Sequence, residues 1–272
     1  MRTTVNGIVT HYTSTVMNGY AAVGAETRAY DANGNLLQVS RLSPGGEQRV
    51  YLPLIIRRTA PSGAAQGAGP AALGVWLRAT EPVTDTVVDY RYDWANRLLA
   101  VTTTVTLRSD AGREVHTHGV RFTYDALGRR TSTAAPGSTT RYVYWAGQVI
   151  EEWDEAGLLT ASYVPGLVFN RGAGRLYYGE DGVGSVRELA DSAGSLVERV
   201  DYEPFGAPRF EAGAPASLAG NPYLFRCQRY DPDSSLYVLG ARHYDPATGR
   251  FLQPGTPNLG NPYTFAGNNP LR

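Results

Sequence analysis

NPYLFRCQRYDPDSSLYVLGARHYDPATGRFLQP, residues 221–254, is the stretch that decides the fold class of this chain. It contains two Tyr-Asp pairs, Tyr230-Asp231 and Tyr244-Asp245, and each is followed by a proline, a few small residues and an apolar or aromatic run. Proline, Asp, Ser and Gly between apolar runs are typical of turns that join short strands. Weaker copies of the unit recur upstream, so the pattern predicts a repeat protein.

The clearest upstream copy is Tyr30-Asp31-Ala32-Asn33-Gly34. An Asp that opens a turn accepts the backbone N–H two residues further on, and Gly at the fourth position adopts a positive φ without steric cost. The unit therefore predicts a hairpin turn in which the Asp has a structural role. The turn residues that the pattern selects are Tyr30, Asp31, Gly34, Tyr92, Asp93, Tyr124, Asp125, Gly128, Tyr230, Asp231, Tyr244, Asp245 and Gly249.

The units recur with a period near 30 residues, since Asp93 and Asp125 are 32 residues apart and Asp125 and Asp154 are 29 apart. Such a period with turn signals throughout indicates stacked hairpins in a repeat array. The 18 Tyr, 31 Gly and 17 Pro against only 2 Met favour many short strands. We predict an all-β chain of stacked Tyr-Asp hairpins.

One segment departs from this pattern. Between residues 59 and 72, 12 of 14 residues are Ala, Gly, Pro or Ser, a composition that buries too little apolar surface to order itself. We therefore divide the chain into degenerate repeat strands over 1–58, a linker or inserted loop over 59–80, and the main repeats over 81–272.

Composition limits the classes of partner. Lys plus Arg and Asp plus Glu both number 25, so bulk charge favours neither nucleic acid nor an anionic membrane as a partner. The N-terminal segment lacks the apolar region of a signal peptide, and the apolar run at 52–56 is too short to span a bilayer, so we expect no membrane span. The single cysteine, Cys227, has no His near it in sequence and is expected to be a small packed residue.

Candidate chemical groups are few, and we expect no cofactor. His116 and His118 lie on one face of a predicted strand, but without a third ligand nearby they predict a packed or solvent-facing pair rather than a metal site. The acidic run at 151–155 is interpreted as the solvated tip of an edge strand. Residues suited to stacking on a sugar are Tyr144, Trp145 and Trp153, although cross-strand pairing in the sheet is the simpler interpretation.

The chain resembles the Rhs, or YD-repeat, proteins, and above all their C-terminal Rhs repeat-associated core region, as found in bacterial polymorphic toxins and wall-associated proteins. The resemblance is strong from about residue 124 onward and implies an antiparallel sheet that spirals into a hollow shell around a C-terminal toxin domain. The motifs that carry it are residues 181–187 (DGVGSVR), 201–206 (DYEPFG), 230–232 (YDP), 241–246 (ARHYDP), 248–252 (TGRFL) and 267–270 (GNNP).

Three positions depart from the family pattern. Cys227 and Ser235 stand where the family usually has Gly, so two tight turns are expected to be less favourable here. After the TGRFL motif the family usually has an Asp that acts in self-cleavage, whereas this chain has Gly255. Aspartic chemistry needs two carboxylates that share a proton, so we predict no self-cleavage and no other enzymatic activity.

The resemblance thus implies a strongly twisted antiparallel sheet of Tyr-Asp hairpins that remains open, and the resulting expectation is a structural scaffold, a segment of a YD-repeat shell. Its partners would be neighbouring YD repeats or a toxin or cargo domain of a larger protein, and its open sheet edges would favour edge-to-edge self-association. The family implies a bacterial secreted or cell-surface protein. The alternative is a secreted or cell-surface carbohydrate-binding or adhesion module that uses Trp145 or Trp153.

Overall fold

The computed structural model describes residues 2–5, 8–14, 20–23, 26–42, 49–52, 75–78, 83–109, 112–172, 174–255 and 261–270. Strands, turns and short 3-10 helices make up this part of the chain, and it contains no α-helix. Accordingly, none of the described residues form a helix long and apolar enough to cross a membrane. The prediction of an all-β fold is confirmed.

Seventeen strands form one antiparallel sheet whose order follows the sequence, except that β5 pairs directly with β8. Tight turns join most neighbouring strands, so the sheet is a long meander. Its strands are β1 (Arg2–Val5), β2 (Ile8–Ser14), β3 (Tyr20–Val23), β4 (Glu26–Tyr30), β5 (Leu36–Leu42), β8 (Val83–Tyr92), β9 (Leu98–Ser109), β10 (Gly112–Tyr124), β11 (Arg130–Ala135), β12 (Ser138–Trp145), β13 (Gln148–Trp153), β14 (Leu159–Val164), β15 (Val168–Arg171), β16 (Gly174–Glu180), β17 (Val186–Ala190), β18 (Leu196–Tyr202) and β19 (Pro208–Phe210).

Among the described residues, two smaller sheets and three short 3-10 helices accompany the large sheet. One small sheet is a pair of strands, β6 (Arg49–Leu52) and β7 (Val75–Arg78). The other has four strands, β20 (Arg229–Asp231), β21 (Leu236–Leu239), β22 (Arg242–Asp245) and β23 (Arg250–Phe251). The 3-10 helices are η1 (Glu211–Gly213), η2 (Phe225–Cys227) and η4 (Ala266–Asn268).

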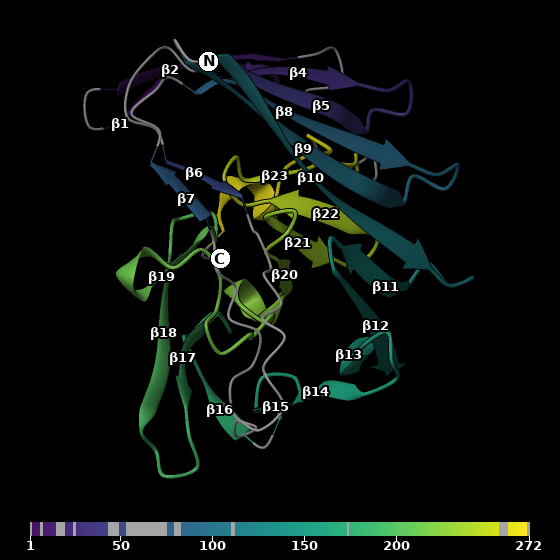
Figure 1. The fold of residues 1–272 in the computed structure, drawn as a ribbon, viewed down its shortest axis with the longest axis vertical. Helices are drawn as coiled ribbons and strands as arrows, with labels where there is room; N and C mark the ends of the chain where they lie inside the picture. Colours follow the sequence, from purple (N-terminus) through teal and green to yellow (C-terminus); the bar gives the residue numbers. More distant parts are fainter. Residues whose placement is uncertain are drawn as a thin grey trace.

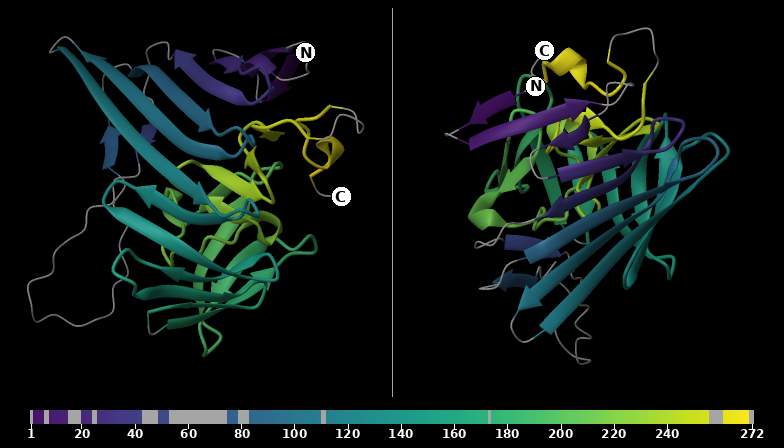
Figure 2. Two further views of the ribbon diagram at one scale, coloured as in Figure 1. Left: turned by 90° about the vertical axis from the view of Figure 1, so that its right-hand side faces the viewer. Right: turned by 90° about the horizontal axis from the view of Figure 1, so that it is seen from above.

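The large sheet curls around residues 221–255 and 261–270, which we call the core segment (Figure 1). In this view the sheet passes from the purple strands at the top, through β10–β12 on the right, to the green β17–β19 on the left, and β20–β23 lie inside the curl. Figure 2 shows the open sheet and the yellow core segment from two further directions. Among the described residues, the outer strands β1 and β19 each pair with one neighbour, so the sheet does not close on itself.

Apolar side chains of the inner face and the core segment bury one another in three clusters. In one of them, Leu98 and Phe122 of the sheet pack with Leu236 and Leu252 of the core segment. Burying such a side chain stabilises the fold by about 1.5–3 kcal/mol, so the core segment supplies the apolar cover that the inner face requires. The largest cluster contains Val200, Phe210, Leu224, Phe225, Tyr230, Tyr237, Tyr244, Phe251 and Phe265.

The predicted division of the chain can be compared with the structure in the linker and in the N-terminal strands. Most of the predicted linker, 59–80, lies outside the described residues, but its residues 75–78 form β7. Because β5 pairs with β8, the segment between them is inserted between two neighbouring strands of one sheet. The strands within 1–58, apart from β6, belong to the same sheet as the main repeats.

Candidate functional site

The Tyr-Asp turns share one hydrogen-bond pattern. Asp125 Oδ1 accepts the backbone N–H groups of Leu127 and Arg129, both at 2.9 Å. Gly128, at φ 79°, donates its N–H to the Asp125 carbonyl. The Arg129 N–H, together with the Arg129 guanidinium, lowers the pKa of the Asp125 carboxyl. The same pair of backbone contacts occurs at Asp31, Asp93, Asp181 and Asp191.

A tyrosine at the end of one hairpin contacts the turn of the hairpin before it. Tyr124 donates its hydroxyl to the carbonyl of Leu98, the first residue after the preceding turn, at 2.6 Å. The Arg97 guanidinium lies over the Tyr124 ring at 5.4 Å from its centroid. Equivalent phenol-to-carbonyl bonds join Tyr92 to Leu36, Tyr144 to Arg130 and Tyr202 to Val186. These bonds link one repeat to the next.

Tyrosines of the core segment make the same kind of contact with the sheet. Each donates its hydroxyl to a main-chain carbonyl at or beside a turn, over a distance of 2.6–2.9 Å. The phenol groups thereby give these carbonyls a hydrogen-bond donor from the core segment. The pairs are Tyr223 to Val149, Tyr237 to Gly206, Tyr244 to Phe205 and Tyr263 to Gly34.

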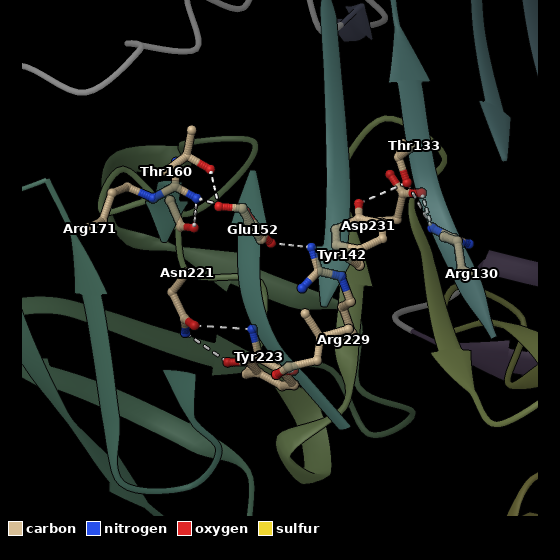
Figure 3. Close-up of polar contacts among 12 residues, drawn as sticks. Arg130, Thr133, Tyr142, Glu152, Thr160, Arg171, Asn221, Tyr223, Arg229 and Asp231 are labelled. Carbon is tan, nitrogen blue, oxygen red and sulfur yellow. Dashed lines mark hydrogen bonds and ion pairs between the residues drawn. The ribbon is translucent and has the colours of Figure 1, made fainter. Parts of the chain in front are cut away.

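A buried carboxylate lies between two arginines where the core segment crosses β13 (Figure 3). Glu152 is 5% exposed, and it pairs with Arg229 of the core segment and, at 3.4 Å, with Arg171 of β15. Burial alone would raise the pKa of the Glu152 carboxyl, but the two arginines outweigh it and lower that pKa. Glu152 is therefore held as an anion in the interior.

A second buried cluster centres on Arg130 of β11. Its Nη1 pairs with Asp231 Oδ2 at 3.0 Å, and its Nη2 lies 2.7 Å from His243 Nε2. Because arginine can only donate, this imidazole nitrogen accepts and the ring is neutral. Burial and then the Arg130 charge lower the pKa of His243 well below its usual value. Gln253 completes the cluster, with its Oε1 accepting the His243 backbone N–H at 2.8 Å.

One sequence-based interpretation needs correction at these clusters, and another residue has a further contact. The Asp231 Oδ1 accepts the Asp233 N–H, which is a turn contact, and its other oxygen is ion-paired with Arg130. Glu152 was placed at a solvated strand tip, whereas it is buried. The reason is a bulge: Val143 pairs with Glu151 and Tyr144 with Val149, so Ile150 is an extra residue that shifts the face of the strand.

The structure separates the aromatic residues proposed for sugar stacking. Trp145, 74% exposed, ends β12 opposite Gln148 at the start of β13, while Trp153 pairs with Arg141 at the other end of β13. The Trp153 indole donates to Glu151, and the Tyr144 hydroxyl donates to Arg130. The three rings therefore form no common platform.

The remaining candidates each have local partners. His116 lies 3.0 Å from Glu114, and His118 lies 3.4 Å from Asp233. Within the described ranges no three His, Cys, Asp or Glu side chains are grouped as a metal site. Burial raises the pKa of the Cys227 thiol to about 11, so it is not a thiolate nucleophile at neutral pH. Cys227 and Ser235 have φ of 50° and 58°, the left-handed region that favours glycine.

A groove of about 980 Å³ lies between three turns of the sheet and the core segment. One wall comes from residues 94, 95, 97, 124–130, 144 and 147–149, and the other from residues 223, 227–229, 238, 240, 241 and 243. We call this the rim groove.

A family model described as the teneurin YD-shell matches residues 111–271, more than half of the chain. The chain belongs to this YD-shell family. The prediction of an Rhs or YD-repeat protein is thereby confirmed. The matched residues include all of β11–β23 and the core segment up to its end, so the family similarity covers both halves of the interface described above.

The YD-shell chain is also similar to parts of curated bacterial toxins. The tRNA3(Ser)-specific nuclease WapA of Bacillus spizizenii is 29% identical over 164 residues, which cover 55% of this chain and 7% of that protein. The double-stranded DNA deaminase toxin A of Burkholderia cenocepacia is 28% identical over 198 residues, 60% of this chain and 13% of that protein. The chain thus spans only a small part of the length of these relatives.

Solved structures similar to this YD-shell chain include two toxin complexes. The crystal structure of TcdB2-TccC3 matches 96% of this chain and 17% of that chain, with a TM-score of 0.45 and 15% identity. The Tc holotoxin pore of Photorhabdus luminescens matches 97% of this chain and 16% of that chain, with a TM-score of 0.43 and 14% identity.

Proposed function

We propose that this chain is a wall segment of a YD-repeat shell that holds a toxin or other cargo domain of a larger protein, and that it does not cleave itself. The observation that carries the proposal is the set of buried contacts between the core segment and the inner face of the curled sheet. Glu152–Arg229 and Arg130–Asp231 join them through buried ion pairs, and the tyrosine-to-carbonyl bonds add further links. Contacts of this kind hold the core segment against the sheet, as a rigid shell wall requires.

The absence of self-cleavage is supported by the state of the buried acids. In the part of the chain that the structure describes, the buried carboxylates are Glu26, Glu152 and Asp231, and each is paired with arginine. An aspartic mechanism needs two carboxylates that share one proton. These buried pairs each join a carboxylate to a guanidinium, so they do not match that arrangement.

The cleavage part of the proposal is tested by incubating the purified chain between pH 4 and pH 8 and measuring its intact mass. The expected result is one species near 29.4 kDa throughout. The incubation contains inhibitors of contaminating proteases. Fragments that still form, at a rate independent of protein concentration, would show self-cleavage and contradict the proposal.

The shell part is tested on the protein as it occurs in its source cell. Electron microscopy is expected to show a hollow particle, and a protease is expected to digest the cargo far more slowly inside the particle than after isolation. Equal digestion rates would contradict a role in enclosure. We further propose that neighbouring repeats pair with the outer strands β1 and β19 and that the protein is secreted or on the cell surface.

Carbohydrate binding receives no support from the geometry. Trp145 lies at the end of β12 opposite the first residue of β13, Trp153 is the last residue of β13, and Tyr144 uses its hydroxyl in a repeat-to-repeat bond.

A further inference from the structure

The rim groove combines exposed apolar tips with stacked arginines, and the shell proposal assigns no role to it. The turns that join β8 to β9 and β10 to β11 lie side by side at the right of Figure 1. Trp94 at the first turn is 91% exposed and Leu127 at the second is 78% exposed, and both line the groove. Large apolar side chains exposed beside a concave surface mark an interaction site.

The groove is rich in positive charge. Four arginines line it against a single acid, Asp125. The acids that pair with the other arginines, Asp93, Asp231 and Glu152, are not part of its lining. Asp125 already accepts two backbone N–H groups and Arg129 Nε. The surface that the groove offers to a partner is therefore aromatic and cationic, which complements an acidic partner.

The two most accessible cations have a regular spacing. Arg97 and Arg129 occupy the same position in successive turns, each pairing through Nε with its own Asp and lying over the tyrosine of the following hairpin. The Arg129 side chain remains 41% exposed. Turns of successive hairpins are two strands apart, which is about 9.6 Å. A polyproline II helix repeats every three residues, which is about 9.3 Å.

We propose that the rim groove binds a polypeptide segment in the polyproline II conformation, with acidic side chains three residues apart and proline or apolar residues between them. The acids would meet Arg97 and Arg129, and the residues between them would pack on Trp94, Tyr124 and Leu127. Aromatic-lined grooves bind this conformation because it is already extended and loses little entropy. The three turns of the wall span about 19 Å, enough for about six such residues.

Nucleic acid also contacts arginines and aromatic rings, but a partner held by phosphates requires a net basic surface. This chain has a formal net charge of zero. The observations therefore favour an acidic peptide, and an oligonucleotide becomes a comparison in the test.

The test is calorimetric titration of the intact chain with a nine-residue peptide made of three Glu-Pro-Pro units. The expected result is saturable binding of one peptide per chain that weakens as salt is added. The matched peptides are three Lys-Pro-Pro units and a permutation in which the three Glu are adjacent, and both are expected to bind at least tenfold more weakly. Equal binding of the permuted peptide, no binding of the first peptide, or tighter binding of a single-stranded oligonucleotide would overturn the proposal.

Protein variants locate the binding. Arg129→Gln and Trp94→Ala change exposed side chains of the groove and are each expected to weaken binding at least fivefold. Arg175→Gln and Trp145→Ala change exposed side chains that do not line it, and binding is expected to be unchanged. Thermal unfolding of each variant checks that it is folded. A loss of binding in the second pair, or none in the first, would place the site elsewhere and overturn the proposal.

Discussion

The hydroxyl of Tyr124 donates a 2.6 Å hydrogen bond to the carbonyl of Leu98, across the boundary between two repeats. The pairing register shifts at Tyr92, which lies opposite Leu98, and again at Tyr124 itself. A bulge interrupts the ladder of backbone hydrogen bonds, so a phenol from the next hairpin is well placed to satisfy the carbonyl. Tyr92 and Tyr124 thus belong both to their own Tyr-Asp turns and to the turns before them.

Replacing this phenol tests the link. Tyr124→Phe removes the donor and leaves the buried Leu98 carbonyl without it, so the free energy of unfolding in urea is expected to fall by about 1–2 kcal/mol. Tyr177→Phe is the control, because Tyr177 is 40% exposed, and a change within about 0.5 kcal/mol is expected there. Similar losses in both variants would show that the Tyr124 bond has no special role.

The buried carboxylate of Glu152 is expected to be far more important for stability than an exposed one. Glu152→Gln leaves the charges of Arg229 and Arg171 unpaired in the interior, so unfolding is expected to become easier by about 3–5 kcal/mol. The matched control is Glu188→Gln, which breaks the exposed pair with Arg199 and should cost no more than about 1 kcal/mol. Urea unfolding followed by circular dichroism measures both, and equal effects would contradict the buried-pair interpretation.

Acid is expected to weaken the fold through His243. The pKa of this imidazole is lowered in the folded state, so its stabilising contribution is complete above about pH 6.5 and is lost as the pH falls toward the folded-state value. The groups that face the ring are Arg130, Gln253 and the Phe122 ring, with Asp231 on the far side of Arg130. One such group contributes a slope of at most about 1.4 kcal/mol per pH unit.

Asp231 has the opposite effect on stability at low pH. Burial raises the pKa of its carboxyl, so protonation by acid removes the free-energy cost of keeping a buried carboxylate charged. The comparison that isolates His243 is the unfolding free energy of the wild type and His243→Gln between pH 6.5 and pH 5. The variant is expected to lose part of the slope. In addition, the nitrogen resonances of the wild-type ring at pH 6 are expected to be those of a neutral imidazole. Identical slopes together with a protonated ring at pH 6 would refute the prediction.

Two turn glycines with positive φ are expected to differ in their tolerance of a side chain. At Gly128, φ is 79° and an added Cβ would meet nothing within 4 Å, so Gly128→Ala is expected to cost only the backbone strain of about 1–2 kcal/mol. At Gly206, φ is 88° and the added Cβ would lie 2.4 Å from the Phe225 ring. Gly206→Ala is therefore expected to cost about 1–3 kcal/mol more, through overpacking.

Thermal and urea unfolding of the two alanine variants provide the measurement. If Gly128→Ala proved as destabilising as Gly206→Ala, the close approach of Phe225 would not be the reason that the second turn requires glycine.

Much of the architecture followed from local sequence signals. Tyr-Asp units with Gly or Asn at the fourth position indicated antiparallel hairpins, and the structure has positive φ at Gly34, Asn96 and Gly128. The buried side of each strand was less predictable. In β13 the bulge at Ile150 breaks the two-residue alternation, so Glu152 points inward although its acidic neighbours suggested an exposed tip. A bulge has no reliable sequence signal when the extra residue is an ordinary strand former.

By itself, the sequence determined the repeat, the antiparallel order of the strands and the family. All three follow from the Tyr-Asp turn, whose conformation is set within five or six residues by an Asp carboxylate and a residue that tolerates positive φ. Only the tertiary structure decided which interior charges meet. Glu152 and Arg229 are 77 residues apart in sequence, and Arg130 and Asp231 are 101 apart. Their pairing depends on the curl of the sheet, because only that curl brings the core segment across its inner face and excludes the water that would otherwise solvate each charge.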